Sequence, residues 1–67
     1  MEAFQERMLF EYNELTERIE KLLNFMNTDM FKQKLSEEER NLMFEQLNGM
    51  SIYSKALRQR LKLQTLI

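Results

Sequence analysis

The sequence predicts an all-α chain folded as an antiparallel helical hairpin with a short connecting turn. The chain has 67 residues, no proline and only one glycine, so little inside it forces a helix to break. Two long segments carry apolar residues at alternating spacings of four and three, which is the period of one helix face. The nine residues between these segments can join antiparallel neighbours, but are too few to return along a helix of about 40 Å.

Composition excludes several functional classes. The chain lacks cysteine, which excludes disulfides and thiolate metal sites, and it lacks histidine, the commonest general base and metal ligand. A formal net charge of −1 gives no direct signal for a nucleic-acid partner. No apolar run approaches the ~20 residues of a membrane span, and the acidic N-terminus does not resemble a signal peptide. We therefore expect a soluble intracellular protein without a cofactor.

The first helix is predicted over residues 2–26. Its apolar stripe is sustained for nearly three heptads. Flanking apolar side chains, including Phe4 and Phe25, widen this face beyond a two-stranded seam and favour a bundle. Glu14–Arg18 and Glu17–Lys21 are expected as ion pairs between successive turns. The stripe consists of Met8, Tyr12, Leu15, Ile19, Leu22 and Met26.

A connection over residues 27–35 precedes the second helix, predicted over residues 36–64. A single 3₁₀ or α turn is expected within the connection. Ser36 and Glu39 match the capping box, in which side chains and backbone N–H groups bond reciprocally at a helix start. The stripe then continues with Met43, Leu47, Met50, Ser54, Leu57 and Leu61.

Asn48 and Gly49 leave the continuity of the second helix open. Asn-Gly is a strong turn signal, and Ser51 offers a cap for a new helix. However, the apolar period crosses the dipeptide without a change of phase, and a glycine inside a helix costs only ~1 kcal/mol. The pattern favours one continuous helix, with a break at residues 48–51 as the alternative.

Charge and leftover apolar residues predict how the hairpin assembles. Residues 1–20 are rich in acids, whereas residues 46–67 carry four bases and no acid, and an antiparallel pairing places these ends side by side. Residues 64–67 are expected to be frayed or docked on another subunit. Two helices leave much apolar surface exposed, so we expect a homo-oligomer, most simply a dimer forming a four-helix bundle. The unpartnered residues are Leu9, Phe10, Phe44, Ile52 and Leu63.

No catalytic or metal-binding constellation is visible, so we do not expect an enzyme. The acids of residues 37–39 are explained by the helix start, where the dipole favours negative charge. The six methionines, at stripe spacing, favour core packing over an adaptable binding surface.

The best candidate ligand site is the basic end of the second helix. One face of this helix presents small, aromatic and basic side chains in turn, which would allow a nucleotide base to stack and a phosphate to meet a guanidinium. Contact with a neighbouring helix is the competing interpretation, and charge runs are usually solvated. The candidate ligand-binding residues are Gly49, Tyr53, Lys55, Arg58 and Arg60.

A family resemblance supports a functional hypothesis. The patterns E-x-x-E-L-x-x-R-I-x-K-L-x-x-F at residues 11–25, F-x-x-x-L-S-x-E-E-R at 31–40, L-M-x-x-Q-L-x-x-M at 42–50 and Y-x-x-x-L-x-x-R-L at 53–61 resemble a family of small accessory proteins related to crAss-like phages. This resemblance implies a phage protein made in the cytoplasm of the infected bacterial host. Small helical phage proteins include sponges for cyclic nucleotide immune signals and inhibitors of host proteins.

Three functions are compatible with these observations. The first is a non-enzymatic counter-defence protein that sequesters a cyclic nucleotide in an oligomeric bundle. The second is a protein-interaction module that inhibits a host factor, and the third is a structural coiled-coil oligomer.

Overall fold

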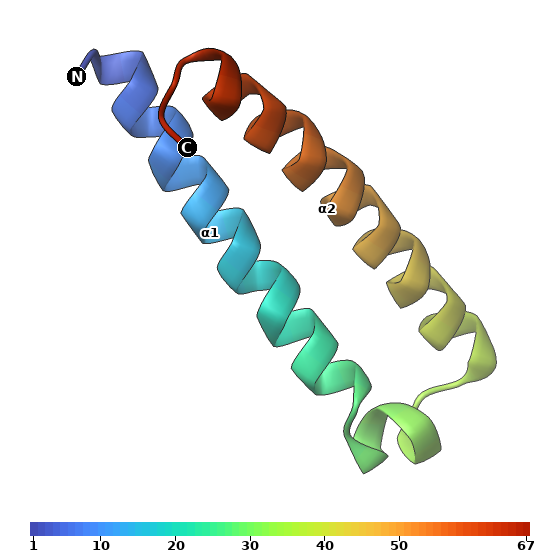
Figure 1. The fold of residues 1–67 in the computed structure, drawn as a ribbon. Helices are drawn as coiled ribbons and strands as arrows, with labels where there is room; N and C mark the ends of the chain where they lie inside the picture. Colours follow the sequence, from blue (N-terminus) through green and yellow to red (C-terminus); the bar gives the residue numbers. More distant parts are fainter.

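The computed structural model describes all 67 residues as two long helices joined by a short helical turn. Helix α1 spans Ala3–Met26, the turn η1 spans Met30–Lys34 and helix α2 spans Glu37–Leu63. The helices lie antiparallel, with both chain termini at one end and η1 at the other (Figure 1). The predicted all-α class and the packing of two helices are confirmed. The molecule is a rod of 46 × 15 × 15 Å, and neither long helix is apolar enough over a sufficient length to span a membrane.

The two apolar stripes meet along the rod and bury few residues. Near the termini, Met8, Leu57 and Leu61 form a buried cluster against which Leu9, Tyr12 and Leu66 pack. Only 6 of the 67 residues are buried, and the central stripe residues of α2 are half-buried. One hairpin alone therefore leaves much of its apolar surface in contact with water. The buried set consists of Met8, Leu15, Met26, Phe31, Leu57 and Leu61.

The start of α2 is capped as its sequence predicts, through one of the two expected bonds. Ser36 has extended backbone angles, and its hydroxyl oxygen accepts a hydrogen bond from the Glu39 N–H at 3.1 Å. The reciprocal bond from the Ser36 N–H to the Glu39 side chain is not formed. The Glu39 carboxylate thus contributes negative charge to the first turn rather than a second capping bond.

The connection differs from the predicted 3₁₀ or α turn, because η1 is a π-helical turn. Thr28 precedes this turn, and its hydroxyl donates to the Phe25 carbonyl at 2.6 Å and accepts from the Phe31 N–H at 3.3 Å. Phe31 is buried and lies edge-on between Phe25 and Phe44, with ring centroids 6.0 and 5.9 Å apart. The π-helical turn thus places Phe31 over the end of the hairpin, where its ring covers the core.

Arg40 fixes η1 against the first turn of α2. Its guanidinium donates to the carbonyl oxygens of Leu35 at 2.7 Å and Lys32 at 3.2 Å. Lys32 lies within η1 and Leu35 directly follows it, and because this helical turn is too short to supply N–H partners for both carbonyls, the arginine replaces the missing donors.

Helix α2 continues through Asn48 and Gly49 without a break, so the continuous alternative is the one observed. No atom lies within 4 Å of the position that a Cβ on Gly49 would occupy. The glycine therefore serves no close approach between α1 and α2.

Residues 64–67 are expected to be frayed, but in the structure residues 64–66 form an ordered cap at the end of α2. Helix α2 ends at Leu63, and Thr65 adopts a φ of 55° that reverses the chain. Leu66 then packs on the cluster of Met8, Leu57 and Leu61. The last residues fold back over α1 (Figure 1), because the apolar Leu66 finds a partner within its own chain.

Only one of the expected ion pairs within α1 forms. Lys21 Nζ lies 3.4 Å from a Glu17 carboxylate oxygen, with both side chains largely exposed. It is the only ion pair in the chain, so Glu14 and Arg18 do not pair with each other. Their charged groups remain available to groups outside the chain.

Candidate functional site

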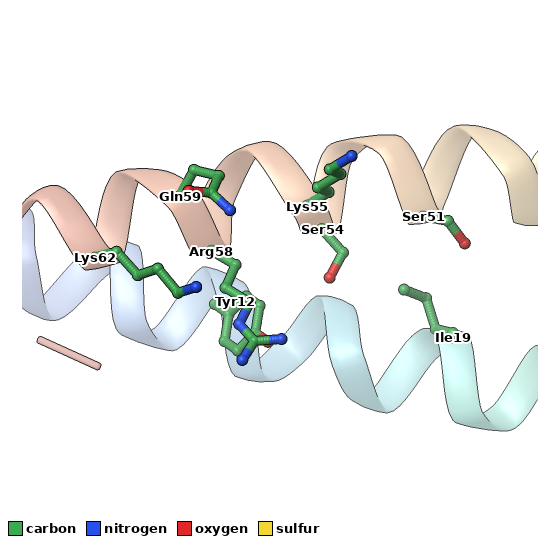
Figure 2. Close-up of a pocket in the computed structure, with 8 residues that line it drawn as sticks. All are labelled: Tyr12, Ile19, Ser51, Ser54, Lys55, Arg58, Gln59 and Lys62. Atoms are coloured by element: carbon green, nitrogen blue, oxygen red, sulfur yellow. The ribbon is translucent and has the colours of Figure 1, made fainter.

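A basic groove runs between the two helices on one side of the hairpin. It has a volume of about 420 Å³, within the range of small-molecule sites. Helix α1 contributes Tyr12 and Ile19 to its floor. Helix α2 contributes Ser51, Ser54, Lys55, Arg58, Gln59 and Lys62, whose side chains line the rim (Figure 2).

The groove arises from one small residue in the stripe of α2. Ser54 holds a stripe position between Met50 and Leu57, both of which are bulky and apolar. Its short side chain leaves space between the helices opposite Tyr12 and Ile19, and it lines the resulting hollow. Ser54 is half-buried, which places a hydroxyl beside the apolar floor.

The electrostatic character of the groove is uniformly positive. Lys55, Arg58 and Lys62 line it, and no aspartate or glutamate does. The Arg58 side chain extends from α2 toward Tyr12, while Ser51 and Ile19 lie at the opposite end (Figure 2). An aromatic face beside a guanidinium and two ammonium groups can receive a planar ring and its attached phosphates.

The structure divides the five sequence-predicted ligand residues between two sides of the hairpin. Lys55 and Arg58 line the basic groove. Tyr53 lines a separate hollow on the opposite side, and Arg60 and Gly49 line neither. Because Gly49, Tyr53 and Arg60 recur at spacings of four and seven, they share the Tyr53 side of α2. One chain therefore does not bring Tyr53 together with Lys55 and Arg58.

Sequence reasoning on α2 alone missed the aromatic residue of the groove. Tyr12 belongs to the other helix and was expected to pack in the apolar stripe, and it is half-buried there. Lys62, one of the four bases of residues 46–67, also lines the groove and is not among the five predicted ligand residues. The alternating spacing of four and three identifies the inward face of each helix. It does not give the register between the two helices, which sets Tyr12 opposite Arg58. No group of three or more carboxylate side chains converges on a metal-sized site.

Comparisons with known proteins give one match. The family model described as Sequestin matches residues 2–63, which covers both helices and the groove between them. No curated protein and no solved structure matches the chain significantly. The match supports a small sequestering accessory protein of the phage type, and it carries no information on a link to crAss-like phages. The family name points to a binding protein rather than a catalyst. The chain belongs to the Sequestin family.

Proposed function

We propose that the chain is a phage counter-defence protein that sequesters a cyclic nucleotide immune signal in the cytoplasm of the infected cell. It acts without catalysis and as an oligomeric helical bundle. The observation that carries this proposal is the basic groove, which is lined by Tyr12 together with Lys55, Arg58 and Lys62 and by no acidic side chain. Membership of a family named for sequestration supports it.

The chemistry of the groove suits a ligand with a flat ring and more than one phosphate. A guanidinium can donate two parallel hydrogen bonds to a phosphate, and two lysines about two turns apart on the same side of the helix can neutralise a second one. The Tyr12 ring offers a stacking surface for a base, and stacking tolerates any base because every base has a π face. Sequestration requires only binding, so a site without a nucleophile or general base is sufficient.

Calorimetric titration with a panel of cyclic di- and trinucleotides tests the proposal. We expect at least one member to bind at micromolar affinity or tighter. Arg58→Ala removes a charged hydrogen-bond donor, and it should weaken binding by roughly tenfold or more. Arg60→Ala is the matched control, because it removes the same group from the same helix on the opposite side.

The proposed site is tested by which of these variants lose nucleotide binding. If no cyclic nucleotide binds, or if Arg58→Ala binds as tightly as the parent, the proposed function fails. If Arg60→Ala and Tyr53→Ala lose binding while Arg58→Ala does not, the ligand occupies the other side of the hairpin.

A second candidate function is inhibition of a host protein. Large apolar side chains that no element of the chain covers favour it: Phe10 is 67% exposed and Ile52 is 63% exposed. This function predicts that tagged chain recovers one host protein in stoichiometric yield. It also predicts that Ile52→Ser abolishes recovery while leaving nucleotide binding unchanged.

A further inference from the structure

The side of the hairpin opposite the basic groove carries a second stripe on α2. The stripe repeats at spacings of four and three, as the core stripe does, and it is rotated to one side of it. Its larger apolar members are exposed, with Tyr53 at 45% and Leu42 at 53%. No part of the chain covers it. The stripe consists of Leu42, Gln46, Gly49, Tyr53, Ala56 and Arg60.

Helix α1 carries a matching charged stripe on the same side. Glu11, Glu14 and Arg18 line the hollow that contains Tyr53, and Lys21 extends the stripe by one further turn. Along the helix the order is acid, acid, base, base. Glu14 and Arg18 have no ion-pair partner in their own chain. The stripes of α1 and α2 together are called the Tyr53 face.

This charge order is self-complementary in one orientation only. If two copies of α1 lie antiparallel with residue 16 of each at the crossing point, Glu14 meets the partner's Arg18. Glu11 then meets the partner's Lys21. A parallel pairing in register would instead place like charges together, which opposes association.

The same crossing point falls at Tyr53 on α2. The Gln5 side chain donates to that of Gln64 at 3.1 Å, so residues level with each other on the two helices have numbers that sum to about 69. Residue 16 of α1 is therefore level with Tyr53. A two-fold axis through this level brings the two Tyr53 rings together and sets Gly49 near the partner's Ala56, where small side chains allow the helices to approach.

We infer that a second copy of this chain packs antiparallel on the Tyr53 face, with the two-fold axis perpendicular to the helices and close to Tyr53. The exposed area is consistent with such a partner. The chain exposes 5280 Å², whereas a compact 8.3 kDa monomer exposes about 4,600 Å². The excess of about 700 Å² is close to the ~800 Å² that each partner buries in a stable interface.

This inference rests on the oligomeric bundle of the proposed function and specifies its geometry. The Tyr53 face lies opposite the basic groove, so the dimer leaves both grooves open on its two outer surfaces. The contact between copies then involves Tyr53, Arg60 and Gly49, whereas the ligand is bound by Lys55 and Arg58.

Charge exchange between two variants tests the antiparallel contact. We expect the parent to sediment as a dimer at micromolar concentration, with twice the 8.3 kDa mass of the chain. Glu14→Arg and Arg18→Glu each place like charges together, and each should raise the dimer dissociation constant roughly tenfold or more. An equimolar mixture of the two variants restores both pairs and should form a heterodimer as tight as the parent.

Glu20→Arg is the matched control, because it makes the same charge change at an exposed residue of α1 that lies away from the Tyr53 face and has no ion-pair partner, and it should leave the dimer intact. Tyr53→Ala is a second variant that should weaken the dimer without changing charge. The inference is overturned if the parent is monomeric, if Glu14→Arg or Tyr53→Ala leaves the assembly intact, or if the mixture does not restore it. Calorimetry on the same variants separates the two proposals, because a failed dimer leaves nucleotide binding intact and a failed ligand leaves the dimer intact.

Discussion

The Leu66 N–H donates a hydrogen bond to the Leu61 carbonyl oxygen at 3.0 Å, across the end of helix α2. The Thr65 N–H donates to the Lys62 carbonyl, also at 3.0 Å. These two bonds form a Schellman motif, which satisfies carbonyls that a helix end would otherwise leave unpaired. The motif also brings the Leu66 side chain onto the buried cluster that contains Leu61. The helix end is thus part of the core.

Replacing Thr65 with glycine should stabilise this cap. Thr65 holds a φ of 55°, a conformation that costs an L-residue about 1–2 kcal/mol and that glycine adopts freely. We expect Thr65→Gly to raise the free energy of unfolding by about 1 kcal/mol in urea denaturation. Thr65→Ala is the control, because it loses the same hydroxyl but keeps a Cβ. An equal gain from alanine would show that the backbone angle is not the cause.

Leu61 should be among the most sensitive positions in the chain. Its side chain has 0% exposure, and truncation of a buried leucine to alanine typically costs about 2–5 kcal/mol. A chain with so few buried residues has little stability in reserve, so Leu61→Ala should be largely unfolded by far-ultraviolet circular dichroism at 37 °C. Leu63→Ala, at a position 82% exposed, should melt with the parent. Similar melting of the two variants would contradict the core described above.

Ser36 should contribute through its single capping bond. Ser36→Ala removes the acceptor for the Glu39 N–H and should cost ~1 kcal/mol, which lowers the melting temperature by several degrees. Ser36→Asp keeps an acceptor oxygen at the same place and should melt near the parent. An unchanged melting temperature in Ser36→Ala would mean that water replaces the cap.

The sequence was sufficient to predict the helices because one periodic signal specifies them. Met8, Leu15, Leu57 and Leu61 were expected in the stripes and are buried in the structure. The apolar period also continues in phase across Gly49, and the helix is continuous there. Local chemistry predicted the cap at Ser36, but only one of its two bonds forms.

The groove could be predicted only in part, because it belongs to two helices. Lys55 and Arg58 were identified from α2 alone, but Tyr12 required the register between the helices. Tyr53 was grouped with Lys55 and Arg58 because all three are close in sequence, although the helical turn of about 100° per residue separates their directions. The cap at Thr65 was missed because a β-branched residue rarely adopts a positive φ.

Gly49→Ala should stabilise the hairpin itself. A Cβ at this position meets no atom of the chain, and alanine is favoured over glycine inside a helix by ~1 kcal/mol. In a dimer, contact between copies at Gly49 would obscure this gain in stability. The substitution should therefore be made in the Glu14→Arg variant, in which the dimer is weakened. We expect a gain of about 1 kcal/mol in the free energy of unfolding there. A loss of stability in that background would mean that the Gly49 site is crowded within one chain.

The placement of the two proposed surfaces predicts how many ligands bind. If copies join through the Tyr53 face, each keeps a complete basic groove, lined by both of its own helices. Calorimetry should therefore give one cyclic nucleotide per chain, with no cooperativity between the two sites of a dimer. The monomeric Glu14→Arg variant should bind with the affinity of the parent, and binding should weaken as salt screens Lys55, Arg58 and Lys62. One ligand per two chains would instead mean that the grooves face each other, which places the contact between copies on the groove side.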